Sequence, residues 1–385
     1  MYDVAVVGAG PAGATAALAA ARSGARVLLL DRSDFPRDKP CGDGIAPQAL
    51  DVLRVLGVDA AEGYRPIPLL RLDAPGGAMA QRTMSRPARV IPREVFDARI
   101  VEAAVAAGVQ FERRTIRRLE SRADRVIVDG IEASVVIGAD GASSTVRRLL
   151  GLAVNPPGHI AIAIRGYSPY PADEPLRQHI VMSETAWPGY AWQFPIGDGR
   201  CNVGYGEVLS GTPVSRRYLL DRLESLLPWV GEAESLRAHH LPLSTHRPVP
   251  GQGRVLLAGD ALSLINPFTG EGIFYAVVSG AIAGRVAASG AVDPALEYAK
   301  AMRARLGRHL RHTSLTAFMG RSRHLVRSGI AVAARDQRVF DTFVELGLGD
   351  GLITPRLLGG VFAEGIAAGV RNGVARSRRA GSGSH

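Results

Sequence analysis

The sequence has very little cysteine and lysine, and each shortage excludes a class of protein. Cys41 and Cys201 are the only cysteines among 385 residues, which excludes a disulfide framework and favours a reducing, cytoplasmic setting. Lys39 and Lys300 are the only lysines, so arginine supplies almost all of the net charge of +10. An arginine excess is typical of proteins with acidic partners or a membrane surface, but a GC-rich coding bias gives the same composition. We expect no nucleic-acid partner.

Long apolar runs, an N-terminal extension and metal-ligand clusters are also missing from the sequence. The longest apolar stretch, 272–284, is too short and too interrupted by glycine to span a bilayer. The first strand begins within the first three residues, which leaves no room for a signal or transit peptide. His239, His240 and His246 have no partners at metal-ligand spacing, so no metal site is expected. Residues 376–385 are expected to form a disordered tail.

A strand–helix–strand pattern fills the first 31 residues of the chain. Residues 4–7 form a short, continuously apolar run, which predicts a buried parallel strand. Residues 14–22 are rich in alanine and predict a helix, and residues 26–30 predict a second strand. Together they form the βαβ unit in which a glycine-rich turn has a specific meaning.

The turn after the first strand carries Gly8, Gly10 and Gly13 in G-x-G-x-x-G spacing. The first glycine allows the tight turn, the second lets a phosphate approach the backbone, and the third lets the helix lie close to the strand. The free N–H groups of the helix then face a pyrophosphate. Asp31 ends the second strand, where a carboxylate accepts hydrogen bonds from both hydroxyls of an adenosine ribose and repels a 2′-phosphate. The unit therefore predicts an adenine dinucleotide.

Two later segments have the same form as this first turn, a buried strand that ends in a Gly/Asp turn. They are VVIGADGASSTVRR at 135–148 and RVLLAGD at 254–260. Ligands of open α/β sheets bind beyond the carboxyl ends of the strands, so three such turns would converge on one long ligand. Between the last two, residues 151–250 alternate strands with Gly and Pro turns, which predicts an antiparallel sheet. This order implies interleaved domains.

These three segments resemble, in order, the flavoprotein hydroxylase superfamily, whose fold surrounds FAD with a GxGxxG turn, a DG turn and a GD turn. The resemblance implies an α/β fold, in which a Rossmann-like FAD-binding domain is interleaved with an antiparallel β-sheet substrate domain and followed by C-terminal helices. The FAD-binding domain would comprise 1–60, 93–150 and 250–290, the substrate-binding sheet 61–92 and 151–249, and the helical region 291–375. No second G-x-G-x-x-G unit exists for a nicotinamide cofactor, so NAD(P)H that visits transiently or a ferredoxin-like protein would supply electrons.

The resemblance also implies which residues contact FAD. Arg93 heads the pattern RxxFDxxI, where the superfamily places an arginine near the FAD phosphates, and Ile116 would touch the adenine. Asp260 would hold the ribityl chain or contact the pyrophosphate. The helix that begins at Gly272 would point its amides at the pyrimidine oxygen of the flavin, which stabilises negative charge on the reduced ring. The full set of expected contacts is Gly8, Gly10, Ala12, Gly13, Asp31, Arg32, Cys41, Gly42, Arg93, Ile116, Asp260, Gly270, Gly272 and Ile273.

Three shorter motifs narrow the resemblance to the geranylgeranyl reductase family. PCGDG at 40–44 resembles the family's PCGxG loop beside the isoalloxazine, and YAWQFP at 190–195 resembles its YxWxFP segment, which lines the substrate cavity. NPFTGEG at 266–272 fits the same family. The resemblance implies an FAD-dependent reductase that saturates C=C bonds of a prenyl diphosphate, lipid or quinone. The expected substrate contacts are Tyr190, Trp192, Phe194 and Pro267, and the candidate catalytic proton donors are Cys41 and Tyr190.

Other functions and other roles stay open at this point. An FAD-dependent monooxygenase of secondary metabolism would have the same fold, and a halogenase is disfavoured because it needs a tunnel lysine, for which only Lys39 and Lys300 are available. A flavin-bound electron-transfer protein is disfavoured by the aromatic strand. Cys41 could be a small packing residue and Asp140 a helix cap, and the three aromatic side chains could stack in a core. The basic segment 303–312 could be a solvated helix face or a contact site for a phospholipid or diphosphate.

Overall fold

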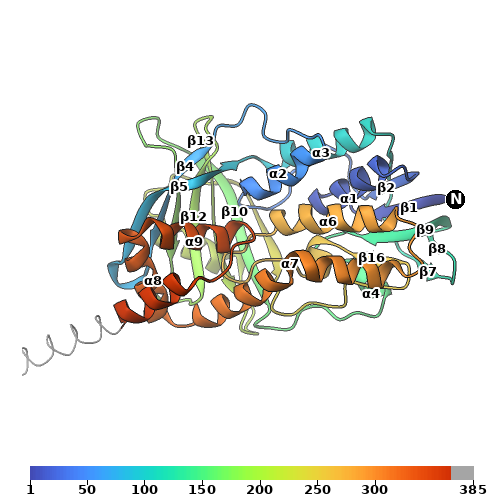
Figure 1. The fold of residues 1–385 in the computed structure, drawn as a ribbon. Coiled ribbons are helices and arrows are strands. Elements are labelled where there is room, and N and C mark those ends of the chain that lie inside the picture. Colours follow the sequence, from blue (N-terminus) through green and yellow to red (C-terminus); the bar gives the residue numbers. More distant parts are fainter. Residues whose placement is uncertain (366–385) are drawn as a thin grey trace, which may run out of the picture.

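The first of two β-sheets places the three predicted Gly/Asp turns at one edge. The computed structural model describes residues 1–365 (Figure 1). The strands of the first sheet are β1 (Tyr2–Val7), β2 (Val27–Asp31), β6 (Gln110–Arg113), β7 (Leu119–Ser121), β8 (Val126–Val128), β9 (Ile131–Gly138), β15 (Gly251–Gln252) and β16 (Val255–Leu257). Strands β16, β9, β1, β2 and β6 are neighbours in that order and run parallel. The turns that follow β1, β9 and β16 therefore lie side by side.

Helices pack tightly against this sheet and against each other. They are α1 (Pro11–Arg22), α2 (Pro47–Val55), α3 (Arg93–Ala106), α4 (Thr145–Leu149) and α6 (Ile273–Ala287). The backbones of α1 and α6 are in contact, because a Cβ on Gly280 would lie 2.1 Å from the carbonyl oxygen of Ala12. A Cβ on Gly284 would likewise lie 2.1 Å from the carbonyl oxygen of Ala16. Any larger side chain at these glycines would push the two helices apart.

The second sheet has eight strands and curls beside the first (Figure 1). Its strands are β3 (Gly44–Ile45), β4 (Ile67–Asp73), β5 (Met79–Val90), β10 (Ile160–Pro169), β11 (Arg177–Met182), β12 (Gly189–Pro195), β13 (Arg200–Val208) and β14 (Glu234–Pro242). The expectation of a purely antiparallel sheet was wrong at one pair, since β4 and β11 are parallel. Between them the chain returns to the first sheet, and this long crossover lets both strands run in the same direction.

The C-terminal helices are α7 (Pro294–Met319), α8 (Arg323–Arg335) and α9 (Gln337–Leu348). Helix α7 packs on α6 and on β15 and β16 of the first sheet. Helices α8 and α9 cover the second sheet and share a core with β5 through Met84, Ile330 and Phe340. A further helix, α5 (Arg216–Leu226), packs on β10 and β13. Within residues 1–365, no helix has the length and apolar character needed to cross a membrane. The predicted fold class is confirmed. The expected tail 376–385 lies outside the described residues.

Candidate active site

The glycines of the first turn serve two purposes. A Cβ on Gly8 would lie 2.4 Å from the carbonyl oxygen of Ala139. A Cβ on Gly13 would lie 1.7 Å from the carbonyl oxygen of Gly8, so both positions require glycine for close packing. At Gly10 the nearest atom to a Cβ would be Arg37 Nη2, at 3.6 Å. The backbone at Gly10 is therefore open to a ligand, as a phosphate-binding turn requires.

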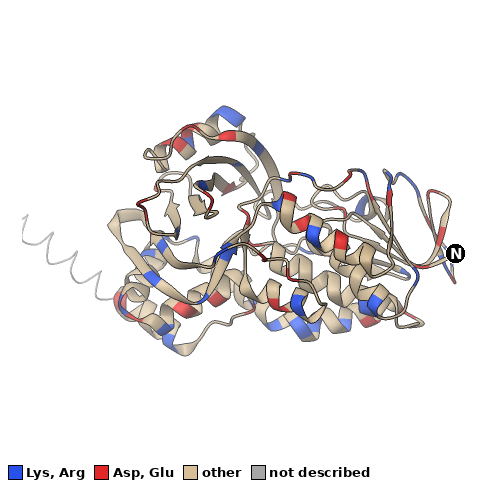
Figure 2. Ribbon diagram, turned by 90° about the horizontal axis from the view of Figure 1, so that it is seen from above, with Lys and Arg blue, Asp and Glu red and all other residues tan. Residues whose placement is uncertain are grey.

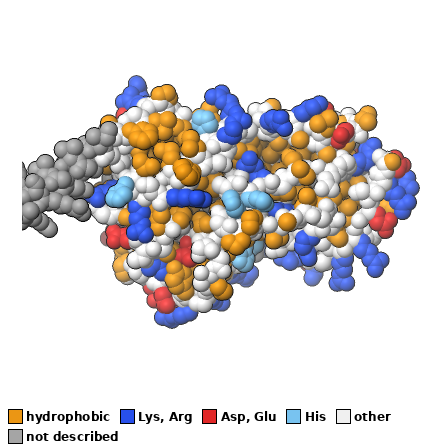
Figure 3. All heavy atoms as spheres, turned by 90° about the horizontal axis from the view of Figure 1, so that it is seen from below, with side chains coloured by type: hydrophobic (Ala, Val, Ile, Leu, Met, Phe, Trp, Pro, Cys, Tyr) orange, Lys and Arg blue, Asp and Glu red, His pale blue; other side chains and the backbone are white. Residues whose placement is uncertain are grey.

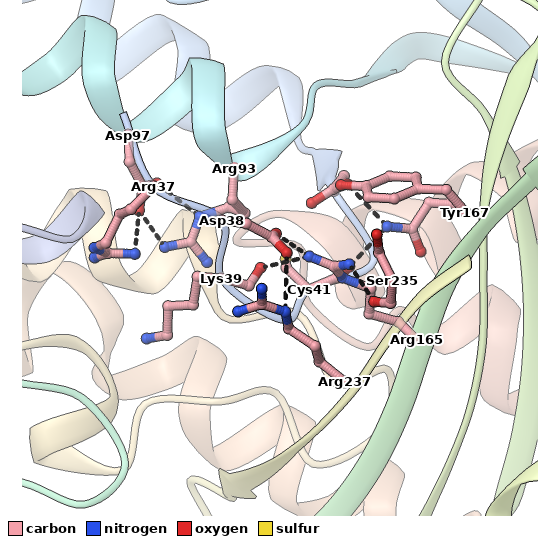
Figure 4. Close-up of polar contacts among 12 residues, drawn as sticks. Arg37, Asp38, Lys39, Cys41, Arg93, Asp97, Arg165, Tyr167, Ser235 and Arg237 are labelled. Atoms are coloured by element: carbon pink, nitrogen blue, oxygen red, sulfur yellow. Dashed lines mark hydrogen bonds and ion pairs between the residues drawn. The ribbon is translucent and has the colours of Figure 1, made fainter. Parts of the chain in front are cut away.

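Arg37 and Arg93 lie beside this turn, and Lys39 lies beside Gly141 in the turn that follows β9. Figure 4 shows these three cationic side chains. Arg93, at the start of α3, donates hydrogen bonds of 2.6 and 2.7 Å to Asp97, which also lies 3.4 Å from Arg37. Asp97 is completely buried and compensates one positive charge of the two. A cavity lies beside the first turn, and Gly10, Lys39 and Arg93 are among the residues that line it. Burial lowers the pKa of the Lys39 ammonium, and the attraction of Asp260 partly offsets this. The residual positive charge at the N-terminus of α1 fits a diphosphate group.

Most of the expected FAD contacts line the cavity, and the others lie outside its lining. Those that line the cavity are Gly10, Ala12, Cys41, Gly42, Arg93, Asp260, Gly270, Gly272 and Ile273. Asp31 lies at the end of β2, and its carboxylate accepts hydrogen bonds of 2.7 and 2.9 Å from two backbone amides. Arg32 is exposed and Ile116 is buried in the core, and neither lines the cavity. The role of each residue toward FAD stays a prediction.

The aromatic strand β12 forms a wall of the cavity. Tyr190, Trp192 and Phe194 all line it, and their successive ring centroids are 6.0 and 6.4 Å apart. The Tyr190 hydroxyl donates to a backbone carbonyl in the turn before α6. The indole N–H of Trp192 donates to Asn202 Oδ1 at 2.9 Å. Pro267 also lines the cavity, so the structure brings the four expected substrate contacts together.

A buried carboxylate, which the sequence analysis missed, holds the loop that carries Cys41. Asp43 is fully buried with a φ of 58°. Its Oδ2 accepts hydrogen bonds from the Tyr167 hydroxyl at 2.6 Å and from Asn202 Nδ2 at 2.8 Å. The Asn202 amide also donates to the Cys41 carbonyl at 2.8 Å. Burial raises the pKa of Asp43 to about 6. Asp43 therefore ties this loop to β10 and β13.

An ion pair between this loop and β10 is the second anchor of the loop (Figure 4). Arg165 of β10 is 2% exposed and pairs with Asp38 of the loop. Its guanidinium also donates to the carbonyls of Ser235 at 3.1 Å and Lys39 at 3.3 Å. Arg237 of β14 lies 3.3 Å from the second Asp38 oxygen. The second sheet therefore fixes the position of a loop that belongs to the FAD-facing side.

Glu271, just before α6, is one of the acidic side chains that line the cavity. Its Oε1 accepts a hydrogen bond from the backbone N–H of Phe274 at 2.7 Å. Protein surrounds the carboxyl group even where it faces the cavity, and this burial raises its pKa to about 7. Burial also raises the pKa of the Cys41 thiol to about 11, and burial and the Glu271 charge raise the pKa of Tyr190. Near neutral pH, Glu271 is therefore the readiest proton donor of the three.

Beyond the aromatic strand, the cavity continues between the second sheet and the C-terminal helices. We call this part, lined by β4, β11, α8, α9 and residues 353–361, the apolar arm. The whole cavity has a volume of about 380 Å³. Typical walls of the apolar arm are Leu72, Ile180, Met182, Ile330, Phe343 and Val361. No charged side chain of the described residues lines it, so burying an ionic group there would be costly.

Comparisons with known proteins decide the family. A family model described as an FAD binding domain matches residues 1–165. The menaquinone reductase of Mycolicibacterium smegmatis is 32% identical over 323 residues, which cover 75% of this chain and 77% of that protein. Digeranylgeranylglycerophospholipid reductase 1 of Methanopyrus kandleri is 35% identical over 312 residues, which cover 74% of this chain and 80% of that protein. The chain belongs to the geranylgeranyl reductase family of FAD-dependent oxidoreductases.

Solved structures have the same fold as this member of the geranylgeranyl reductase family. A geranylgeranyl bacteriochlorophyll reductase-like protein from Thermoplasma acidophilum superposes with a TM-score of 0.78 at 21% identity, covering 94% of this chain and 95% of that one. A flavin-dependent brominase superposes with a TM-score of 0.71 at 18% identity, covering 98% and 99%. At these identities the likeness shows the fold alone. The predicted family and the predicted cofactor, FAD, are confirmed.

Proposed function

We propose that this chain is a reductase that saturates C=C bonds in the prenyl chain of a lipid, quinone or diphosphate. The observation that carries the proposal is the apolar arm, which begins at the aromatic strand and has no charged wall. A hydrocarbon chain gives up no hydrogen bonds when it leaves water for such walls, and its burial is favourable. Relatives named menaquinone reductase and digeranylgeranylglycerophospholipid reductase support the same class of substrate.

FAD would bind at the polar end of the cavity. The open backbone at Gly10 and the N-terminus of α1 would receive the diphosphate, and Arg37 and Arg93 would balance its charge. Asp260, in the turn that follows β16, would accept hydrogen bonds from the ribityl hydroxyls. Reduced FAD, when bound, supplies the hydride for such reactions. Trp192, on the aromatic wall, would exclude water from the reacting bond.

Glu271 would supply the proton. Saturating one C=C bond adds a hydride to one carbon and a proton to the other, and the two electrons come from the reduced flavin. The Glu271 carboxyl lines the cavity where the turn before α6 meets the aromatic strand. Cys41 and Tyr190, the candidates from the sequence, hold their protons more tightly. The Tyr190 hydroxyl is also engaged with a backbone carbonyl. The Glu271 carboxylate would then regain a proton from solvent.

Anaerobic turnover tests the proposed function. Purified holoprotein is reduced with dithionite and mixed with geranylgeranyl diphosphate or menaquinone, and the products are analysed by mass spectrometry. We expect products heavier by two hydrogen atoms per saturated bond, together with reoxidation of the flavin absorbance. The same assay with NAD(P)H or a reduced ferredoxin in place of dithionite identifies the electron donor. Products heavier by one oxygen atom, formed only in air with NAD(P)H, would overturn the reductase in favour of a monooxygenase.

A further inference from the structure

The last turns of α7 expose two large apolar side chains. Leu315 is 48% exposed and Phe318 is 67% exposed. The guanidinium of Arg321 lies 6.0 Å from the centre of the Phe318 ring. Seen from below (Figure 3), hydrophobic side chains gather at the upper left, where α7 ends and α8 begins. Such side chains beside cationic groups are typical of surfaces that meet a membrane interface.

Positive charge predominates along this part of the chain. Residues 298–335 contain nine Lys or Arg and no Asp or Glu, and Lys300, Arg305 and Arg335 pair with acidic residues outside this range. Acidic and basic residues are mixed over most of the ribbon in Figure 2. Arg308, Arg311 and Arg321 are exposed and make no ion pair within residues 1–365. Positions 308, 311, 315 and 318 follow helical spacing, so they share one face of α7. This face therefore combines an apolar end with uncompensated positive charge.

The same turns of α7 also form a wall of the cavity. Thr316, Met319 and Gly320 line it, and the Trp187 indole donates hydrogen bonds of 2.9 and 3.0 Å to the carbonyls of Gly320 and Arg321. Pro188 lines the cavity and is itself exposed, so the cavity reaches the surface beside the end of α7. The exposed patch and the opening are thus adjacent.

We propose that the end of α7, defined by Arg308, Arg311, Leu315, Phe318 and Arg321, docks on an anionic lipid bilayer. The arginines would lie among lipid phosphates, and the two apolar side chains would enter the acyl boundary. A protein partner fits less well, because a stable interface buries about 800 Å² on each side and this patch has only two large apolar residues. The docking would also let an apolar substrate chain pass from the bilayer into the cavity beside Pro188, and this part of the inference rests on the proposed function.

Vesicle binding tests the docking without any turnover. The holoprotein is sedimented with vesicles of phosphatidylcholine alone or of phosphatidylcholine mixed with phosphatidylglycerol. We expect binding only to the mixed vesicles, and less binding at high salt. Arg308→Gln/Arg311→Gln/Arg321→Gln should bind about a hundredfold more weakly. Leu315→Ser/Phe318→Ser should lose at least about tenfold. Equal binding of these variants and the wild type would overturn the proposal, as would equal binding to both vesicle types.

The control variant changes exposed apolar residues elsewhere. Val55→Ser/Val292→Ser alters side chains that are 86% and 93% exposed, and it should bind vesicles as the wild type does. A direct readout uses Phe318→Trp, whose emission should be quenched by brominated acyl chains more strongly than that of the wild type. Light scattering completes the test, because a dimer that Leu315→Ser/Phe318→Ser dissociates would make this face an interface between copies and overturn the proposal. If the wild type binds the mixed vesicles but saturates no prenyl substrate in the anaerobic assay, the docking stands and the proposed function is contradicted.

Discussion

The polar end of the cavity and the apolar arm are built in different ways. At the polar end, several charged groups have fixed partners, such as Arg93 with Asp97 or Asp43 with Tyr167 and Asn202. The apolar arm is assembled from segments far apart along the chain, and its walls differ only in size and shape. Substitutions at the polar end should therefore affect folding and cofactor together. Substitutions in the arm should change which chain fits and leave the cofactor undisturbed.

Separating Arg93 from Asp97 should have the largest effect. In Arg93→Met, the buried Asp97 keeps only its 3.4 Å contact with Arg37. We expect the free energy of unfolding to fall by about 3–5 kcal/mol, because a buried charge loses its partner. FAD affinity should fall at least about tenfold, since a cation beside the diphosphate is lost. Urea unfolding of the apoprotein and fluorescence titration with FAD measure the two effects.

A double variant separates the two roles of Arg93. Arg93→Met/Asp97→Leu removes the buried charge together with its partner, so most of the lost stability should return. FAD affinity should stay low, because no cation has been restored at that position. Recovery of both quantities would mean that Arg93 serves only the fold and that the polar end has a different phosphate contact.

Glu271→Gln should have the next largest effect, which is on the rate of substrate reduction and on how that rate depends on pH. If the Glu271 carboxyl donates the proton, reduction by the wild type should slow as pH rises through about 7, because the carboxyl is then ionised. The variant should be at least about a hundredfold slower at neutral pH, with this pH dependence lost. FAD affinity should not change. Single-turnover measurements under anaerobic conditions follow the rate.

Apoprotein stability gives a second readout for Glu271 that needs no turnover. The folded carboxyl keeps its proton up to pH about 7, whereas in the unfolded chain it ionises near 4.5. Its contribution to stability is therefore complete below pH 4.5 and is lost as pH rises to about 7. Glu271→Gln should lack this part of the decline, and the part from Asp43 should remain. Glu207→Gln is the matched control, since Glu207 lines the cavity but accepts hydrogen bonds from Tyr205 and Tyr218. Identical profiles for wild type and Glu271→Gln would refute the assignment.

A pair of neighbours on β11 should give the smallest effect and the clearest contrast. Ile180 lines the apolar arm, whereas Val181 packs in a different core that contains Leu219 and Leu223 of α5. Ile180→Phe narrows the arm, so KM for the longest accepted chain should rise about tenfold, with FAD affinity unchanged. Val181→Phe should cost about 1–3 kcal/mol of stability and leave chain-length preference unaltered. A shift in preference with Val181→Phe instead would place the chain outside the arm.

The polar end was largely predictable because its signals are local in the sequence. A strand, a turn and a helix within 31 residues are enough to predict a phosphate-binding turn at Gly10, and the structure places Gly10 on the cavity wall. The alternation of Tyr190, Trp192 and Phe194 likewise fixes which face of β12 they share. Residue types that belong to a motif could therefore be placed before the fold was known.

Other parts of the site depend on contacts that no local pattern contains. Asp43 and Glu271 are ordinary loop acids in the sequence, and only the packing of distant strands and helices gives them the surroundings that raise their pKa values. Strand β14 was not predicted, because it lies at a sheet edge with most of its side chains exposed and so has no apolar alternation. The apolar arm needs β4 beside β11, a parallel pairing that spans about a hundred residues of chain. Residues 291–375 were expected only to be helical.

The backbone contact between α1 and α6 fixes a distance inside the enzyme. Because Gly280 and Gly284 let the two helices touch at Ala12 and Ala16, neither helix can slide without the other. The N-terminus of α1 adjoins the phosphate-binding turn, and the N-terminus of α6 follows Gly272 on the cavity wall. The separation of these two positive ends is thus a property of the protein and does not adapt to the ligand. A flavin that is too short to reach both helix N-termini, such as FMN, would contact only one of them.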